Sequence, residues 1–147
     1  MDRRRAYVDS SVILRGLLQD PGALMGLADW DLVASDLMEL EALRTLYRVH
    51  SEGLLSDDDL GARIAELREI VAALEQFPIT RQVLKRAGGP FPGILKTLDA
   101  IHLATALLWS EHFGEDIVMI THDRQLARVA RSSGLEVYPW PMPSPSV

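Results

Sequence analysis

Two short apolar segments that each lead into an aspartate constrain the fold more than any other feature of the sequence. Residues 6–8 read Ala-Tyr-Val and are followed by Asp9; residues 117–120 read Ile-Val-Met-Ile and lead through a Thr-His pair to Asp123. Unbroken apolar runs of this kind are typical of strands buried inside a parallel sheet. Open α/β sheets bind their ligands at the carboxyl ends of strands, so Asp9 and Asp123 are candidate site residues.

The remaining sequence alternates helical and extended patterns. Strands are expected at 5–8, 31–34, 117–120 and 136–138, and helices at 11–18, 23–28, 36–50, 56–77, 79–87, 98–109 and 125–132. Ser11 is the expected N-cap of the first helix. This order predicts an α/β fold of three layers, a short parallel sheet flanked by helices, in one domain over 1–138. The Pro-rich segment 139–147 is expected to be an extended or mobile tail.

Composition excludes several classes of protein. A formal net charge of −6 and a sequence pI of about 5.1 argue against a protein that coats nucleic acid through a broad basic field. The lack of cysteine excludes disulfides and thiolate metal sites, so any metal must be held by oxygen or imidazole. No apolar run approaches the roughly 20 residues of a membrane helix, and Asp9 interrupts any signal-peptide core. We therefore expect a cytoplasmic protein with no membrane partner.

Glu41 is an acidic residue within an apolar helical stripe. On a helical wheel it shares one side with Leu37, Leu40, Arg44 and Tyr47. Arg44 is its i+3 neighbour, so an ordinary ion pair on the helix surface is one explanation for this carboxylate. The other explanation is that Glu41 belongs to a functional site.

Asp99 lies in the first turn of a predicted helix, 98–109, that is apolar on almost all sides. A carboxylate buried there costs several kcal/mol unless it is paired or bound to a metal. Two interpretations remain open: Asp99 caps the helix, or it belongs to a site. His102, one turn later, is interpreted as a hydrogen-bonded structural residue rather than a ligand.

The four carboxylates of Asp9, Glu41, Asp99 and Asp123 together suggest one acidic pocket in a small domain. Carboxylates that lie close together repel each other unless a cation sits among them. A site of oxygen ligands without cysteine favours Mg²⁺ or Mn²⁺.

Five segments, taken in order, carry a resemblance to a known family. They are residues 7–11 (Tyr-Val-Asp-Ser-Ser), 35–41 (Ser-Asp-Leu-Met-Glu-Leu-Glu) with Arg44, 98–106 (Leu-Asp-Ala-Ile-His-Leu-Ala-Thr-Ala), 121–124 (Thr-His-Asp-Arg) and 134–135 (Gly-Leu). With these segments, which span nearly the whole chain, the sequence resembles the PIN-domain ribonucleases and, among them, the VapC-type toxins of toxin–antitoxin pairs.

The resemblance implies a Mg²⁺- or Mn²⁺-dependent endoribonuclease that hydrolyses RNA phosphodiesters with metal-activated water. The acidic set of the family falls on Asp9, Glu41, Asp99 and Asp123, with Glu39 as a competitor of Glu41. Asp9 and Asp99 would anchor the metal, and Glu41 would bind through water or act as a base. Flanking positions that match the family are Ser10, Arg44 and Thr121. Candidate phosphate contacts are Arg81, Lys85, Arg86 and Lys96, for which ordinary solvated charge is an equal alternative.

The resemblance also implies partners: a small VapB-like antitoxin that blocks the acidic pocket, and a second copy of the toxin in a homodimer. Apolar residues of the first half are expected either to line the antitoxin groove or to form ordinary core; they are Leu14, Leu17, Leu18, Met25 and Leu27. Two other functions remain open. One is a noncatalytic PIN-like module that binds RNA or protein, and the other is a small-molecule phosphohydrolase with an aspartyl nucleophile at Asp9.

Overall fold

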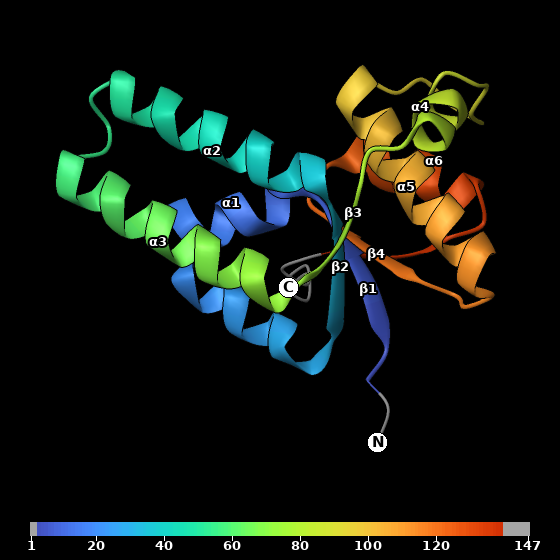
Figure 1. Ribbon diagram of the computed structural model, residues 1–147, viewed down its shortest axis with the longest axis horizontal. Helices are drawn as coiled ribbons and strands as arrows, with labels where there is room; N and C mark the ends of the chain where they lie inside the picture. Colours follow the sequence, from blue (N-terminus) through green and yellow to red (C-terminus); the bar gives the residue numbers. More distant parts are fainter. Residues whose placement is uncertain (1–2, 140–147) are drawn as a thin grey trace, which may run out of the picture.

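Five parallel strands form the sheet of the computed structural model, which describes residues 3–139 (Figure 1). The strands are β1 (Arg5–Val8), β2 (Asp31–Ser35), β3 (Glu75–Phe77), β4 (Val118–Thr121) and β5 (Glu136–Pro139). Their order across the sheet is β3-β2-β1-β4-β5, and every neighbouring pair is parallel. The carboxyl ends of all strands therefore lie along one edge, with β1 in the centre.

Helices cover both faces of the sheet and make three layers. They are α1 (Ser10–Leu18), the 3-10 helix η1 (Pro21–Asp29), α2 (Asp36–Ser51), α3 (Asp57–Ala73), α4 (Arg81–Ala87), α5 (Thr97–Phe113) and α6 (Arg124–Ser132). In Figure 1, α1, α2 and α3 lie on one side of the sheet and α4, α5 and α6 on the other. The predicted α/β fold with a short parallel sheet is confirmed.

Alternation along β1 divides the core between the two layers. Ala6 and Val8 face the layer of α1 and α2, and they pack with Ile13 and Met38 in one buried cluster. Tyr7 points to the opposite face and joins a second cluster with residues of α5 and α6. Successive side chains of a strand point to opposite faces, so a strand buried on both sides reads as an unbroken apolar run.

The prediction missed β3 and gave α3 too many residues. The helix predicted to run to Phe77 ends at Ala73, and Leu74 already has an extended backbone, with φ −95° and ψ 152°. Glu75, Gln76 and Phe77 then pair with β2 at the edge of the sheet. Pro78 disfavours helical geometry only in Phe77, so the end of α3 at Ala73 follows from the pairing of residues 75–77 with β2.

Two local predictions about the first helices were also wrong. Asp9, not Ser11, is the N-cap residue of α1. On α2, the buried face consists of Leu37, Met38, Ala42 and Leu46. Leu40 and Tyr47, which were expected on an apolar stripe, are exposed.

The apolar residues considered for an antitoxin groove are for the most part core. Leu17 and Leu27 are buried, and Leu14 and Leu18 pack against the same cluster. Only Met25 is freely exposed. Gly16 of α1 belongs to this tightly packed region, since a Cβ atom there would lie 2.2 Å from Cγ of Leu24 in η1. The predicted tail at 139–147 falls outside the described residues except for Pro139, which ends β5.

Candidate active site

Asp9 lies at the carboxyl end of the central strand and is almost fully buried, with 3% of its surface exposed. Each of its carboxylate oxygens accepts a hydrogen bond from a hydroxyl group. Ser11 donates to Oδ1 at 2.6 Å, and Thr121 donates to Oδ2 at 2.7 Å. Burial raises the pKa of Asp9, while these two hydrogen bonds lower it. The carboxylate is thus held in one orientation before any ligand arrives.

The same hydroxyl groups connect the end of β1 to the end of β4. The Thr121 hydroxyl also accepts a hydrogen bond from the backbone amide of Asp123, and the Ser11 hydroxyl accepts one from the amide of His122. Asp123 caps α6, because its Oδ1 accepts from the amide of Leu126 at 2.8 Å. One oxygen of Asp123 is therefore engaged in a structural hydrogen bond, which leaves the other for a ligand.

Glu41 reaches the site from the second turn of α2 and contacts α5. Its Oε1 lies 2.5 Å from Nε2 of His102, whose Nδ1 in turn lies 2.6 Å from the hydroxyl of Tyr7. His102 and Tyr7 are buried, whereas the side chain of Glu41 is 18% exposed. The partner of Glu41 is thus His102; Arg44, which was considered for an ion pair, is exposed and makes no salt bridge with Glu41.

Asp99 lies in the first turn of α5, at the same edge of the sheet. Lys96 is the N-cap residue, so the carboxylate is not the cap that one interpretation proposed. The pKa of Asp99 is raised to about 6, first by burial and then by neighbouring negative charge. The charges that act on it are, in order, those of Asp123, Asp9 and Glu41, and His102 opposes them.

These contacts bring the four predicted carboxylates to one end of the molecule. They come from β1, α2, α5 and the start of α6, and Figure 1 shows the first turns of α2 and α5 near the same edge of the sheet. Besides burial, the negative charges of the other three carboxylates raise the pKa of Asp99. A cation bound among the four carboxylates would relieve this repulsion. Oxygen donors of this kind suit Mg²⁺ or Mn²⁺.

The four carboxylates are not yet close enough together to form a metal site. Among residues 3–139, no three acidic or histidine side chains already stand at the spacing that holds a metal ion. The donor set fits a hard divalent cation by its chemistry, and the carboxylates would have to move closer together to share one.

The flanking residues differ in their contacts. Thr121, one of the predicted flanking residues, donates a hydrogen bond to Asp9; the serine that bonds to Asp9 is Ser11, the neighbour of the predicted flanking residue Ser10. Among the predicted phosphate contacts, Arg86 forms an ion pair with Glu111 at 2.9 Å and is already engaged. Lys96 is exposed, three residues before Asp99.

The sequence did not predict the contacts of Ser11 and Tyr7 at the site, and it predicted His102 as a hydrogen-bonded residue without its partner Glu41. Ser11 could have been found, because a serine two residues after an aspartate can bond back to it. The pairing of His102 with Glu41 joins positions 61 residues apart, and no local pattern indicates it.

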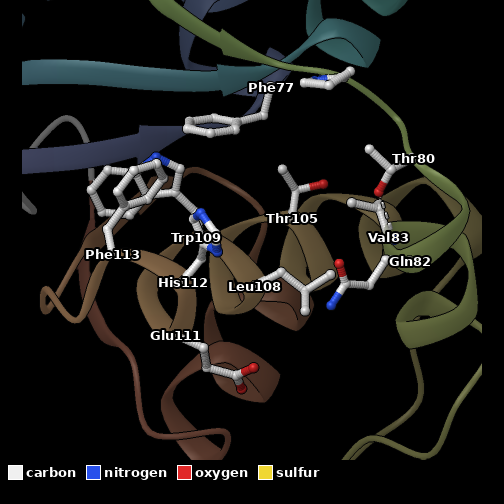
Figure 2. Close-up of a pocket in the computed structure, with 11 residues that line it drawn as sticks. Phe77, Thr80, Gln82, Val83, Thr105, Leu108, Trp109, Glu111, His112 and Phe113 are labelled. Atoms are coloured by element: carbon white, nitrogen blue, oxygen red, sulfur yellow. Dashed lines mark hydrogen bonds between the residues drawn. The ribbon is translucent and has the colours of Figure 1, made fainter.

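A cavity of about 450 Å³ lies on the α5 side of the sheet, between α5 and the segment from β3 to α4 (Figure 2). Its walls are mainly apolar and include Phe77, Val83, Leu108, Trp109 and Phe113. None of the four carboxylates lines it. Across residues 3–139, no helix combines the length and the apolar character that crossing a bilayer requires.

Comparisons with known proteins agree with the fold and with the order of the motifs. The PIN domain family model matches residues 6–132. Ribonuclease VapC46 of Mycobacterium tuberculosis is 33% identical over 136 residues, which cover 89% of this chain and 94% of that protein.

Two solved structures share the fold at low sequence identity. A toxin–antitoxin complex from Klebsiella pneumoniae has a TM-score of 0.60 and 19% identity, and the match covers 83% of this chain and 90% of the other. VapBC-1 from nontypeable Haemophilus influenzae has a TM-score of 0.58 and 17% identity, with coverage of 92% and 98%. The five-stranded parallel sheet, the matched family model and the related ribonuclease together show that this chain belongs to the PIN-domain family, among its VapC-type members.

Proposed function

We propose that the protein is a Mg²⁺- or Mn²⁺-dependent endoribonuclease and the toxin of a toxin–antitoxin pair. The observation that carries the proposal is the set of four carboxylates at the end of the sheet, where burial and the charges of the other three raise the pKa of Asp99 to about 6. A related chain named as a ribonuclease supports RNA as the substrate.

Each carboxylate would have a distinct task. Asp9, fixed by two hydroxyl groups, and Asp99, which has no capping task, would hold the cation, with the free oxygen of Asp123 completing the set. When bound, Mg²⁺ would supply Lewis acidity and lower the pKa of a coordinated water. Glu41, partly exposed, would bind the cation through that water or accept the proton of the water as the phosphodiester is hydrolysed.

An RNA-cleavage assay with the purified protein tests this proposal. We expect cleavage of a structured RNA in Mg²⁺ or Mn²⁺ and none in EDTA. Asp9→Asn and Asp99→Asn should each lower the rate by several orders of magnitude, because each removes an anionic ligand and keeps the shape. Asp58→Asn, an equal substitution at an exposed residue in the first turn of α3, should leave the rate unchanged.

The same assay decides between this proposal and its alternatives. Protein that binds the RNA but leaves it intact in Mn²⁺ would be a noncatalytic module. Release of inorganic phosphate from small phosphate esters without cleavage of RNA would indicate a phosphohydrolase. Undiminished RNA cleavage by Asp9→Asn or Asp99→Asn would refute the assignment of the site.

The proposed partner is a small VapB-like antitoxin that covers the acidic site. The toxin–antitoxin complexes with the same fold support it. Leu40 and Leu98, each directly before a site carboxylate in sequence, are 55% and 46% exposed. Such side chains would be buried by an apolar segment of the antitoxin.

Co-expression with the product of the neighbouring gene tests the antitoxin. We expect suppression of RNA cleavage and of growth arrest, and Leu40→Asp should weaken the complex while leaving cleavage by the free protein intact. If the neighbouring gene product leaves the RNA cleavage and the growth arrest of the unsubstituted protein unchanged, the proposed partner is refuted.

We further propose a homodimer that acts in the cytoplasm. Leu84 of α4 and Phe113 of α5 are about half exposed and offer apolar surface for a second copy. A sedimentation experiment should give the mass of two chains, and the mass of one chain at micromolar concentration would refute the dimer.

A further inference from the structure

We propose that His102 is a positioning residue for the reaction: it fixes the carboxylate of Glu41 at the acidic site, and Tyr7 fixes His102 in turn. This inference rests on the proposed nuclease function, because it assigns a task to a residue beside one of the proposed site carboxylates.

The contacts form one chain across three elements. Tyr7 lies on β1, His102 on α5 and Glu41 on α2, and the two distances along the chain are 2.6 Å and 2.5 Å. The ring of Tyr7 also meets that of His102 edge to face, with ring centres 5.8 Å apart. The same three elements carry or adjoin Asp9, Asp99 and Glu41, and the chain ends on the carboxylate of Glu41.

The hydrogen-bonding capacity of the three groups fits this order. A carboxylate only accepts, so Nε2–H of His102 donates to Glu41. The Tyr7 hydroxyl lies at Nδ1, so both ring nitrogens of His102 have a partner. Tyr7 thereby fixes the orientation of the ring that holds Glu41.

Glu41 needs such an anchor more than the other three carboxylates do. Asp9 is short and bonded to two hydroxyl groups, and Asp123 is bonded to the first turn of its own helix. Asp99 has a short side chain in the first turn of α5. Glu41 has a longer, more mobile side chain, and its i+3 neighbour Arg44 is exposed. Without His102, the carboxylate could turn toward Arg44 and solvent.

His102 itself is 1% exposed, so it acts through Glu41 rather than on RNA. Hydrogen-bond partners of metal ligands typically contribute 10–100-fold to metal affinity or activity. If His102 were purely structural, its replacement would lower the melting temperature but would change neither the metal affinity nor the activity.

The experiment measures Mn²⁺ affinity by calorimetry without RNA, and kcat and KM for RNA cleavage. We expect His102→Asn, which is too short to reach Glu41, to weaken Mn²⁺ binding by roughly 10–100-fold and to lower kcat with little change in KM. His102→Gln keeps an N–H near the position of Nε2 and should restore most of both. His112→Asn is the matched control, since it makes the same substitution at an exposed histidine near the other end of α5.

A second pair of variants tests whether His102 acts through Glu41. Glu41→Gln with His102→Asn should be no worse in Mn²⁺ affinity than Glu41→Gln alone. Should His102→Asn fail to fold, Tyr7→Phe decides, because it removes one hydroxyl and keeps the ring. We expect its Mn²⁺ affinity to lie between those of the wild type and Glu41→Gln.

The outcomes separate the two proposals. Wild-type protein that neither binds Mn²⁺ nor cleaves RNA would overturn the nuclease function and this inference with it. Wild-type protein that does both, with His102→Asn or Tyr7→Phe unchanged in Mn²⁺ affinity and kcat, would overturn only the role of His102.

Discussion

Replacing Asp99 by Asn should make the metal-free protein more stable. The pKa of Asp99 is raised to about 6 from an ordinary value of 3.8, by burial and by the charges of three other carboxylates. A group whose pKa rises on folding favours its neutral form in the fold, so its ionised form destabilises the native state at neutral pH. Asn has nearly the same volume and no charge, and removes this cost.

The expected size follows from the pKa. An increase of about 2 corresponds to about 3 kcal/mol at pH well above 6. Because Asp99 is partly exposed, solvent screening reduces this to ~1–2 kcal/mol. For a domain of this size the melting temperature should rise by on the order of 2–8 °C.

Thermal unfolding in EDTA at a series of pH values is the assay. Because folding raises the pKa of Asp99, the gain in stability from Asp99→Asn should be full above pH 6. The gain should shrink as the pH falls from about 6 toward 3.8, and vanish below pH 3.8. Mn²⁺ at a hundredfold excess over Kd should stabilise the wild type by about 2.7 kcal/mol, and the variant much less.

Asp58→Asn provides the control, since this exposed residue should change neither the pH profile nor the gain from Mn²⁺. A variant that melts below the wild type in EDTA at pH 8, or an advantage that does not depend on pH, would refute the reasoning.

Two further predictions concern stability, and each has a matched control. Thr121→Val removes the donor to Asp9 and the acceptor of the Asp123 amide, so urea unfolding should show a loss of about 1–3 kcal/mol. Ser51→Ala, which loses a bond to a carbonyl of its own helix at an exposed position, should cost less, and equal losses would contradict the importance of the Asp9 contact. Gly16→Ala should lower the melting temperature, because overpacking against Leu24 costs about 1–3 kcal/mol. Gly61→Ala on the open surface of α3 should stabilise the protein by about 0.5–1 kcal/mol and so raise the melting temperature. A Gly16→Ala variant that is more stable than the wild type would show that the side chain of Leu24 moves aside at little cost.

The sequence was most informative where burial was complete. The apolar runs before Asp9 and Asp123 predicted β1 and β4 because strands buried on both faces leave no polar position. The nearly all-apolar segment around His102 likewise predicted the buried helix α5.

Prediction failed where local pattern and tertiary contacts disagree. β3 has only three residues, pairs on one side alone and follows an apolar stripe that continues to Leu74. On α2, the helical period allowed two choices of inward face, and the sheet selects the one with Met38 and Ala42. The link from Glu41 to His102 depends on how α2 and α5 approach each other, which neither segment encodes alone.

The hydrogen bond between Asp9 and Thr121 has a consequence for synthesis of the chain on the ribosome. These partners are 112 positions apart, and β4, which carries Thr121, lies beside β1 at the centre of the sheet. A nascent chain that stops short of β4 therefore has Asp9 and Ser11 but lacks Thr121, one of the two hydroxyl groups that orient Asp9, and also lacks Asp123. The acidic site can assemble only when most of the polypeptide has left the exit tunnel. Truncated translation products should accordingly be inert toward RNA, and any activity of the protein begins only after most of it has been made.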